Sequence, residues 1–257
     1  EHLQTLSFDL ELPVGPYGGV IVAGYERTGY DIGGQQMLQK YIVDGYSTNA
    51  WVRYRAPERT FASLPLSLEY GFEGSSVKDA FYWADQGAST ALPITDKSTY
   101  NAYGRAAFSW VNPGSNAAAD VSVQLAFGET DLALGRDTDA AGANVNGTFA
   151  KLTSTLSGQY RMSDKASLST NVSCQIGSSN LDSGQKLALS GATAVRSYAI
   201  GAVNVNDGCY AQNEYFHQIE QQVAVFGFAD VGAGRLWSST FTDALENDQK
   251  NSFAIGG

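Results

Sequence analysis

Two charged residues in the C-terminal third of the chain have types and positions suited to a specific ion pair. Arg196 lies in a long polar segment, Gly191–Asp207, and Asp230 lies in a segment of alternating side chains. A guanidinium can donate two parallel hydrogen bonds to one carboxylate, which the ammonium of lysine cannot imitate. The residues alone leave a plainer alternative open, in which Arg196 is a solvated surface charge and Asp230 lines a pore.

The strand pattern around Asp230 favours the ion pair. Residues two apart share a face of a strand, so Phe226 and Phe228 lie on the side of Asp230, whereas Val225 and Val231 lie on the other side. In a membrane-spanning strand an uncompensated carboxylate facing lipid is costly, so we predict that Asp230 faces an aqueous interior. The two phenylalanines then need a cover, and a loop folded into that interior supplies one.

Other chemistry finds little support in the sequence. His217 follows Glu214 by three residues, but an odd separation on a strand places the two on opposite faces, so we expect no metal site and no cofactor. His2 and His217 are the two histidines, and no Gly-x-Ser-x-Gly motif accompanies them, which argues against an outer-membrane lipase. We expect that the protein is not an enzyme.

The two cysteines, Cys174 and Cys209, show no Cys-x-x-Cys spacing. Both have the side-chain parity of lipid-facing residues, on strands that we expect to be separated by one intervening strand. At about 4.8 Å per strand they would lie too far apart to bond. The sequence therefore predicts two free thiols.

Composition narrows the class of protein. The chain has 257 residues, and its 26 acidic and 16 basic side chains leave a net charge of −10. Proteins that bind the phosphate backbone of nucleic acids need clustered basic residues, so for this acidic chain we expect no nucleic-acid partner. Because the sequence has no phosphate-binding loop, we also expect no nucleotide. Hydrophobic residues make up 43% of the sequence, too many for a disordered chain, yet no apolar run reaches the length of a membrane-spanning helix.

Alternation of apolar and polar residues is the dominant pattern. Leu6, Phe8, Leu10 and Leu12 share one face, and the residues between them are Ser, Asp and Glu. About twelve such segments occur, many of ten or more residues, which is typical of a transmembrane β-barrel with a polar interior. The expected segments are 2–13, 18–31, 45–57, 62–76, 98–112, 116–133, 147–163, 165–179, 184–191, 208–218, 221–234 and 250–257.

The connections alternate in length, as outer-membrane barrels require. Pro13–Gly18 and Met162–Lys165 are short, whereas Lys78–Lys97, Asp131–Asn146 and Gly191–Asp207 are long and polar. We expect an all-β fold, a transmembrane antiparallel β-barrel with a long loop folded inward. Residues 1–257 then form a single barrel domain.

Two motifs add a resemblance to a known family. The order Gly191, then Val195-Arg196-Ser197-Tyr198, then Asp207-Gly208 and Glu214, precedes Phe226-Gly227-Phe228-Ala229-Asp230-Val231-Gly232. This order resembles the C-terminal barrel of the two-partner secretion transporters, the hemolysin activation and secretion proteins of the Omp85 superfamily. In that family a loop with Val-Arg-Gly-Tyr folds back into the barrel and a later strand carries Phe-x-Asp-x-Gly. Ser197 stands where the family has glycine.

The resemblance implies a site and a function. Val195, Arg196, Ser197, Tyr198 and Asp230 would form a loop lock, which is the Arg196–Asp230 pair with Tyr198 packed beside it. The residues that would support the lock are Gly191, Asp207, Gly208, Glu214, Phe226, Phe228 and Gly232. The chain would supply the third to fourteenth of the family's sixteen strands, truncated at both ends, without the periplasmic POTRA modules.

The expected function is type V secretion across the outer membrane of a Gram-negative bacterium. The partners would be a secreted exoprotein cargo and outer-membrane lipid, with no nucleic acid and no nucleotide. The runner-up function is a passive porin or other solute channel, which shares the alternating strands but does not need an arginine loop. A secreted adhesin rich in β-structure is a third possibility, and it would be soluble without detergent.

Overall fold

The computed structural model describes residues 2–36, 39–84, 88, 91–112, 114–196, 198–241 and 249–256. Its contacts divide the chain into two compact units. The first contains Glu1–Pro57, Glu69–Tyr103 and Phe127–Thr148, and the second contains Glu58–Leu68, Gly104–Ala126 and Phe149–Gly257.

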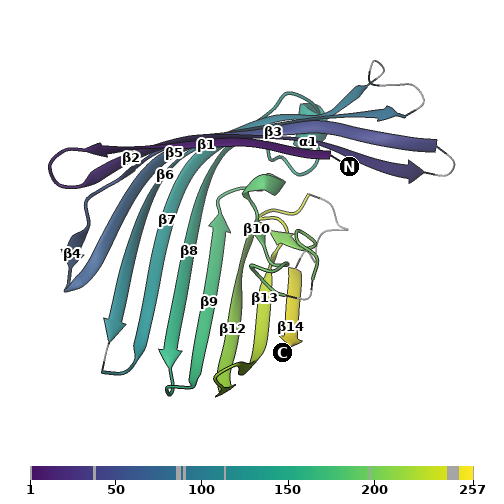
Figure 1. Ribbon diagram of the computed structural model, residues 1–257. Helices are drawn as coiled ribbons and strands as arrows, with labels where there is room; N and C mark the ends of the chain where they lie inside the picture. The colour runs from purple at the N-terminus through teal and green to yellow at the C-terminus, as the bar shows by residue number, and fades with distance from the viewer. Residues whose placement is uncertain are drawn as a thin grey trace. The chain divides into compact units, whose positions relative to one another are not determined.

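Strands account for most of the described chain (Figure 1). They are β1 (His2–Val14), β2 (Gly19–Gln36), β3 (Gln39–Arg55), β4 (Arg59–Phe61), β5 (Leu64–Trp83), β6 (Leu92–Asn112), β7 (Ala117–Leu132), β8 (Gly147–Arg161), β9 (Ala166–Gly177), β10 (Leu187–Ala188), β11 (Asn204–Val205), β12 (Asp207–Glu220), β13 (Val223–Arg235) and β14 (Gln249–Gly256). The helical elements are α1 (Arg136–Ala140) and the short 3₁₀ helix η2 (Ser183–Gln185).

A 12-stranded sheet organises the described residues in the order β1-β2-β3-β5-β6-β7-β8-β9-β12-β13-β14, with β4 paired to β5. The strand pairs whose register is determined in this sheet are antiparallel, and the strand order does not close on itself among the described residues. β10 and β11 form a separate two-stranded sheet. The predicted all-β antiparallel fold is confirmed.

The alternation seen in the sequence separates two faces of the sheet. In the first unit, Leu6, Phe8, Leu10 and Leu12 of β1 are each 49–66% exposed. Phe8 stacks on Tyr25, its partner in β2, with ring centroids 5.7 Å apart. An apolar stripe of this kind is the outer wall that a transmembrane barrel presents to lipid. The opposite face is polar, and there Arg55 forms ion pairs with Glu11 and Glu69 at 3.3 Å.

Some of the expected segments differ from the structure in their bounds, and one differs in its assignment. Lys78–Lys97 is not one long loop, because β5 continues to Trp83 and β6 begins at Leu92. The backbone hydrogen bonds between these strands continue into their polar residues, so the polarity of the sequence does not show where the strands end. The segment 184–191 is not a strand of the large sheet, since it holds part of η2 and the two-residue β10. The short connections at residues 15–18 and 162–165 lie where they were predicted.

In the second unit fully buried side chains gather where the connection between β9 and β12, residues 178–206, meets the sheet. Leu181, Leu189, Val195 and Val205 of this connection are among the largest fully buried side chains of the described chain. A segment covers the sheet closely here, and that segment carries Arg196. None of the helices in the described part of the chain has the length and hydropathy that a bilayer-spanning helix requires.

Candidate functional site

The connection between β9 and β12 carries the short strands β10 and β11 (Figure 1). Its Arg196 contacts Glu214 of β12 and Asp230 of β13. β10 and β11 form its stem, with Leu187 opposite Val205 in the register. A tight turn follows, in which the Val195 N–H donates to the Leu189 carbonyl at 3.1 Å and the Gly191 N–H donates to the Val195 carbonyl at 3.2 Å. Arg196 comes directly after this turn, so its position is set by backbone hydrogen bonds.

Gly191 is required by that turn. Its φ is +115°, in the region that favours glycine, and a Cβ at this position would lie 3.0 Å from Cγ1 of Ile200. Any other residue would strain the backbone and collide with Ile200. The predicted supporting role of Gly191 thus has a local structural basis in the turn that precedes Arg196.

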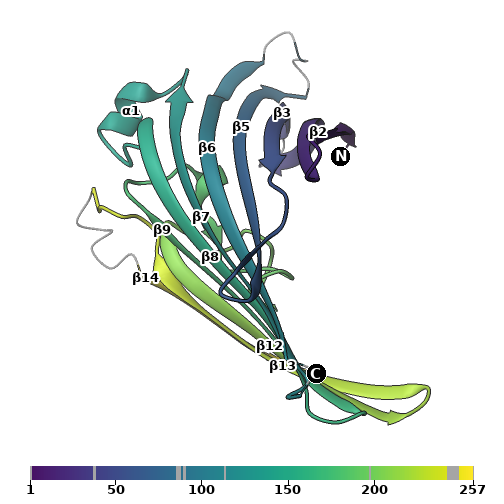
Figure 2. The ribbon, with the colours of Figure 1, turned by 90° about the vertical axis from the view of Figure 1, so that its left-hand side faces the viewer.

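Asp230 lies on β13, on the face that we call the Asp230 face. The register places Asp230 opposite Gln212 of β12, and Gln212 opposite Asn171 of β9. Val223, Val225 and Val231 of β13 have the other parity, and each is about half exposed. The Asp230 side chain, by contrast, is fully buried. Figure 2 shows β9, β12 and β13 from a direction perpendicular to that of Figure 1.

Arg196 and Asp230 meet in a bidentate ion pair. Nε of Arg196 donates to Oδ2 of Asp230 at 2.8 Å, and Nη2 donates to Oδ1 at 2.8 Å. The backbone N–H of Arg196 also donates to Oδ2, at 3.0 Å. A fully buried carboxylate needs several donors to remain charged, and this one residue supplies three.

Three further contacts surround the guanidinium. Nη1 donates to Glu214 at 2.7 Å, Nη2 also donates to the Asn213 carbonyl at 3.3 Å, and the guanidinium lies 4.1 Å from the ring centroid of Phe228. Hydrogen bonding to Asp230 raises the pKa of Arg196, burial opposes that shift, and Glu214 raises it further. Arg196 therefore stays charged, held by two carboxylates and an aromatic face.

The two phenylalanines of the Asp230 face differ in how far the connection covers them. Phe228 is covered by the Arg196 guanidinium, whereas Phe226 remains 52% exposed. Phe226 lies two residues closer to the short connection at residues 221–222, opposite Phe216. The cover supplied by the connection therefore reaches Phe228 and leaves Phe226 half exposed.

Glycines on the Asp230 face make room for the connection. A Cβ on Gly232 would lie 3.2 Å from Val195 and 3.5 Å from Leu189, and one on Gly234 would lie 2.8 Å from Val205. Gly208, opposite Gly234 in the register, would place its Cβ 2.9 Å from the same Val205. Gly232 and Gly208, both expected to support the site, leave this space because they have no side chain.

Replacing Gly232 with Val is expected to push the Val195 turn away from the sheet, because the new methyl groups would overlap Val195 and Leu189. Overpacking of this kind costs about 1–3 kcal/mol of unfolding free energy. Limited proteolysis within residues 186–206 would measure the displacement. Ala233→Val is the matched control, because Ala233 is the next residue on the opposite, exposed face. Equal protection in the two variants would contradict the close packing.

A second polar cluster ties together the ends of β9, β12 and β13. Asn206 is fully buried; its side chain accepts from the Leu181 N–H at 2.6 Å and donates to Ser238 at 2.6 Å. Asp207 accepts from the Gly177 N–H and from Arg235, both at 2.8 Å. Asp207 and Gly208 were expected to support the site, but nothing in the local pattern indicated Asn206, Arg235 or Ser238.

Val195 and Tyr198, two further residues of the predicted lock, differ in exposure. Val195 is fully buried against the sheet, and Tyr198 is 44% exposed. Ser197 lies outside the described residues. Among the residues that the structure describes, no group of three or more His, Cys, Asp or Glu side chains is arranged to hold a metal ion.

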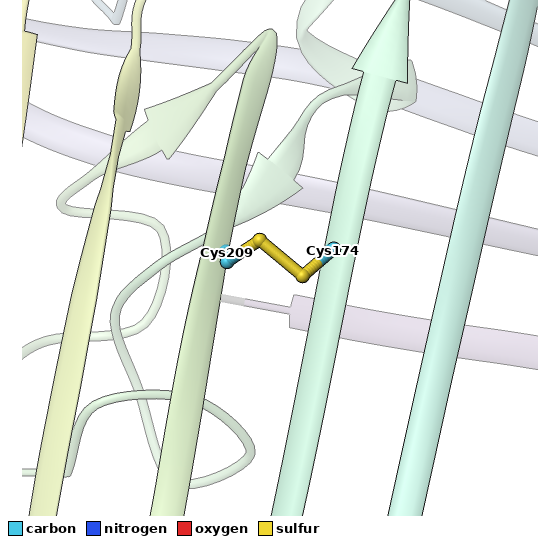
Figure 3. Close-up of a disulfide and its surroundings, with 2 residues drawn as sticks. All are labelled: Cys174 and Cys209. Atoms are coloured by element: carbon cyan, nitrogen blue, oxygen red, sulfur yellow. A yellow bond between two sulfur atoms is a disulfide. The ribbon is translucent and has the colours of Figure 1, made fainter. Parts of the chain in front are cut away.

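The prediction of two free thiols is wrong. Cys174 of β9 and Cys209 of β12 are directly opposite in the register and form a disulfide (Figure 3). The expected intervening strand, 184–191, belongs to the connection, so β9 and β12 are neighbours. The disulfide lies on the face opposite to Asp230, since Ser173 and Gln175, which flank Cys174, are buried on the Asp230 face.

Comparison with known proteins gives two kinds of similarity. A family model described as haemolysin secretion/activation protein ShlB/FhaC/HecB matches residues 101–246, more than half of the chain. A comparison with curated proteins finds no match.

Two solved structures are similar over almost the whole chain. CdiB from Escherichia coli has a TM-score of 0.75 and 14% sequence identity, covering 98% of this chain and 45% of that one. CdiB from Acinetobacter baumannii has a TM-score of 0.68 and 15% identity, covering 98% of this chain and 50% of that one. At such identities the likeness shows the fold. The chain spans about half the length of the CdiB chains it matches.

Proposed function

This chain belongs to the haemolysin secretion/activation protein family ShlB/FhaC/HecB, and from that membership we propose that it forms the wall of a pore that secretes a large exoprotein. Members of the family are outer-membrane transporters of Gram-negative bacteria. The single observation that carries the proposal is the bidentate pair between Arg196 of a returning connection and the buried Asp230 of a wall strand.

The Asp230 face is the lumen of the pore in this proposal. Val223, Val225 and Val231 on the opposite face are about half exposed and apolar, which suits contact with lipid. Asp230 then points inward, and the connection at residues 178–206 lies inside the barrel. The Arg196–Asp230 pair is the loop lock, which holds this connection against the wall while Glu214 and Phe228 surround the guanidinium.

Several features of the lock favour a segment attached to the wall over a loose loop. The pair lies beside the fully buried Val195, which packs over Gly232. Gln212 of the wall donates to the Ala192 carbonyl at 3.1 Å, which adds a second attachment of the same turn. A passive porin needs a water-filled lumen and does not require an arginine segment paired with a Phe-x-Asp-x-Gly strand. The transporter is therefore the better candidate.

The proposed pore forms or breaks no covalent bond. Cargo passes through the lumen, and its folding on the far side of the membrane supplies the driving force. The interior acids and bases, such as Arg55 with Glu11 and Glu69, line the path and keep it wetted.

Deletion of the gene for the full-length protein is expected to remove one large exoprotein from the culture medium and to leave it in the periplasm. Mass spectrometry of both fractions measures this, and restoring the gene should return the exoprotein to the medium. Uptake of small sugars by the deletion strain, compared with the wild type, tests the porin alternative. Impaired uptake with an unchanged set of secreted proteins would refute the secretion function.

A further inference from the structure

One row of side chains crosses β8, β9, β12 and β13 near the short connections at residues 162–165 and 221–222, at the lower ends of these strands in Figure 1. The row is Arg161-Ser167-Phe216-Phe226. Residues directly opposite each other on neighbouring strands share a face of the sheet. Phe226 has the parity of Asp230, so the whole row lies on the Asp230 face and runs from a cation to two aromatic rings.

The next row along the same strands belongs to the loop lock. It is Gln159-Ser169-Glu214-Phe228, and its last two residues surround the Arg196 guanidinium. Successive side chains on one face of a strand lie about 6.8 Å apart. Outer-membrane barrels have their short connections on the periplasmic side. A chain that enters the lumen from the periplasm therefore meets the row of Arg161 and Phe226 before it meets the lock.

A hollow of about 380 Å³ lies at the Arg161 end of the first row, among residues of the second unit. Cations, amides and apolar side chains all contribute to its lining, among them Val111, Gln159, Arg161, Lys165, Phe216 and Gln218. The apolar members are open to a ligand, because Val111 is 69% exposed and Phe216 is 38% exposed. Apolar area and charge thus lie side by side in one hollow.

Backbone hydrogen bonds hold the edge of the hollow in shape. The Arg161 N–H donates to the Asn116 carbonyl at 2.9 Å, and the Gln218 N–H donates to the Lys165 carbonyl at 2.7 Å. These bonds join residues of β8, β12 and the short connections between strands. A hollow that is already formed loses little conformational entropy when a ligand binds.

The charge of the hollow is positive, although the chain as a whole carries a net charge of −10. Its charged lining residues are Arg161, Lys165 and Asp164. Arg161 pairs with Asp164 at 3.1 Å. Lys165 donates to the Ile219 carbonyl at 3.4 Å and forms no ion pair with any residue that the structure describes. The hollow therefore suits a ligand with a negative charge.

The spacing of the charge and the aromatic ring suits an extended peptide. β8 and β12 are two strand spacings apart, about 9.6 Å, and an extended chain covers that distance in about three residues. Arg161 lies on the first of these strands and Phe216 on the second. A small anion would use the cations but would leave Phe216 and Val111 without a contact.

We propose that this hollow binds an extended acidic segment of the exoprotein, in which an Asp or Glu and an apolar residue lie within about three residues of each other. The carboxylate binds Lys165 and Arg161, and the apolar side chain packs on Phe216 and Val111. This inference rests on the proposed secretion function. It places the cargo on the wall one row before the loop lock.

Photocrosslinking in secreting cells tests the position of the cargo. A benzophenone derivative of phenylalanine replaces Phe216 in the full-length protein. The same derivative replaces Tyr215 in the matched control, because Tyr215 is the adjacent residue and faces the other side of β12. Illumination is expected to give a covalent adduct with the exoprotein at position 216, with a yield about tenfold above that at position 215.

The outcomes separate this inference from the secretion function. Normal export without an adduct at position 216, or equal adducts at both positions, would overturn the inference and leave the secretion function in place. An exoprotein that still reaches the medium after deletion of the gene would instead refute the secretion function.

Fluorescence anisotropy of the purified full-length protein in detergent tests the chemistry of the segment. The probes are a labelled peptide with an aspartate two residues before a leucine, and a second peptide with lysine in place of the aspartate. The wild type is expected to bind the aspartate peptide about fivefold more tightly, the effect of an exposed charge contact. Lys165→Gln should reduce this preference, and Phe216→Ala should weaken binding of both peptides by a similar factor.

Arg136→Gln is the matched control for the loss of a cation. Arg136 pairs with Asp131 in the long connection at the other end of β8, and this variant should keep the full preference. Equal affinity of the wild type for the two peptides, undetectable binding of the aspartate peptide at millimolar concentration, or an unchanged preference in Lys165→Gln would each contradict the proposed recognition.

Discussion

Replacing Asp230 with Ala is expected to release the Arg196 turn from the sheet and to impair secretion more than any other single change in the wall. The substitution removes a fully buried carboxylate that accepts three hydrogen bonds from Arg196, and it leaves Glu214 as the carboxylate paired with the guanidinium. Breaking one partner of a buried pair typically costs about 3–5 kcal/mol. The loss appears as a lower unfolding midpoint and as faster cleavage within residues 186–206 by added protease.

The pair can be separated from its surroundings by a double-mutant cycle. Arg196→Ala, Asp230→Ala and the double variant should show a coupling of about 2 kcal/mol in unfolding free energy. Glu214→Gln is the control, because Glu214 is 39% exposed and its contribution should stay below about 1 kcal/mol. Additive effects of the Arg196 and Asp230 substitutions would show that the pair does not hold the turn.

Secretion distinguishes a lock from a mere structural contact. If the lock must open and close for cargo to pass, Asp230→Ala and Arg196→Ala should both reduce export while the protein still reaches the outer membrane in normal amounts. Export at the wild-type level from a variant whose turn is cleaved rapidly would separate the lock from transport.

Replacing both cysteines with Ser is expected to destabilise the wall around the loop. The disulfide closes a ring that runs from Cys174 to Cys209, a sequence separation of 35 residues that includes the whole connection with Arg196. The chain-entropy estimate for a ring of this size is about 4 kcal/mol. Heat-modified migration in detergent gels measures the effect as a lower temperature of unfolding.

Reduction of the disulfide in the wild-type protein tests the same effect without a substitution. The wild type treated with reductant should unfold at the same temperature as Cys174→Ser/Cys209→Ser, and reductant should leave that double variant unchanged. Because the disulfide joins β9 to β12 directly, opening the wall at this seam is expected to require reduction. An unfolding temperature that is insensitive to reductant would contradict a stabilising role of the disulfide.

The connection between β9 and β12 is thus attached in three chemically distinct ways. Its turn is held by the ion pair and by packing over Gly232. Its return to the sheet is held by the buried Asn206 and by Asp207, which pairs with Arg235. The strands on either side of it, β9 and β12, are joined by the disulfide. Each attachment is made by different residues, so loss of one should leave the others measurable.

Period-two alternation determined a large part of this protein from the sequence alone. The side-chain parity of a strand is local, so Leu6 to Leu12 could be assigned to one exposed face and Asp230 to the face opposite Val225 and Val231 without knowledge of the strand order. The same reasoning, with the resemblance of two short motifs to a transporter family, indicated which arginine and which carboxylate would meet. The short connections followed from their turn residues.

The tertiary structure decided what depends on which strands are neighbours. The segment 184–191 alternates like a short strand, and only its pairing with β11 shows that it belongs to the connection and not to the wall. That single difference makes β9 and β12 adjacent and turns two cysteines expected to be free into a disulfide. Asn206 and Ser238 meet for the same reason. Periodicity specifies the face of a strand, whereas the partner across the sheet is set by register between residues distant in sequence.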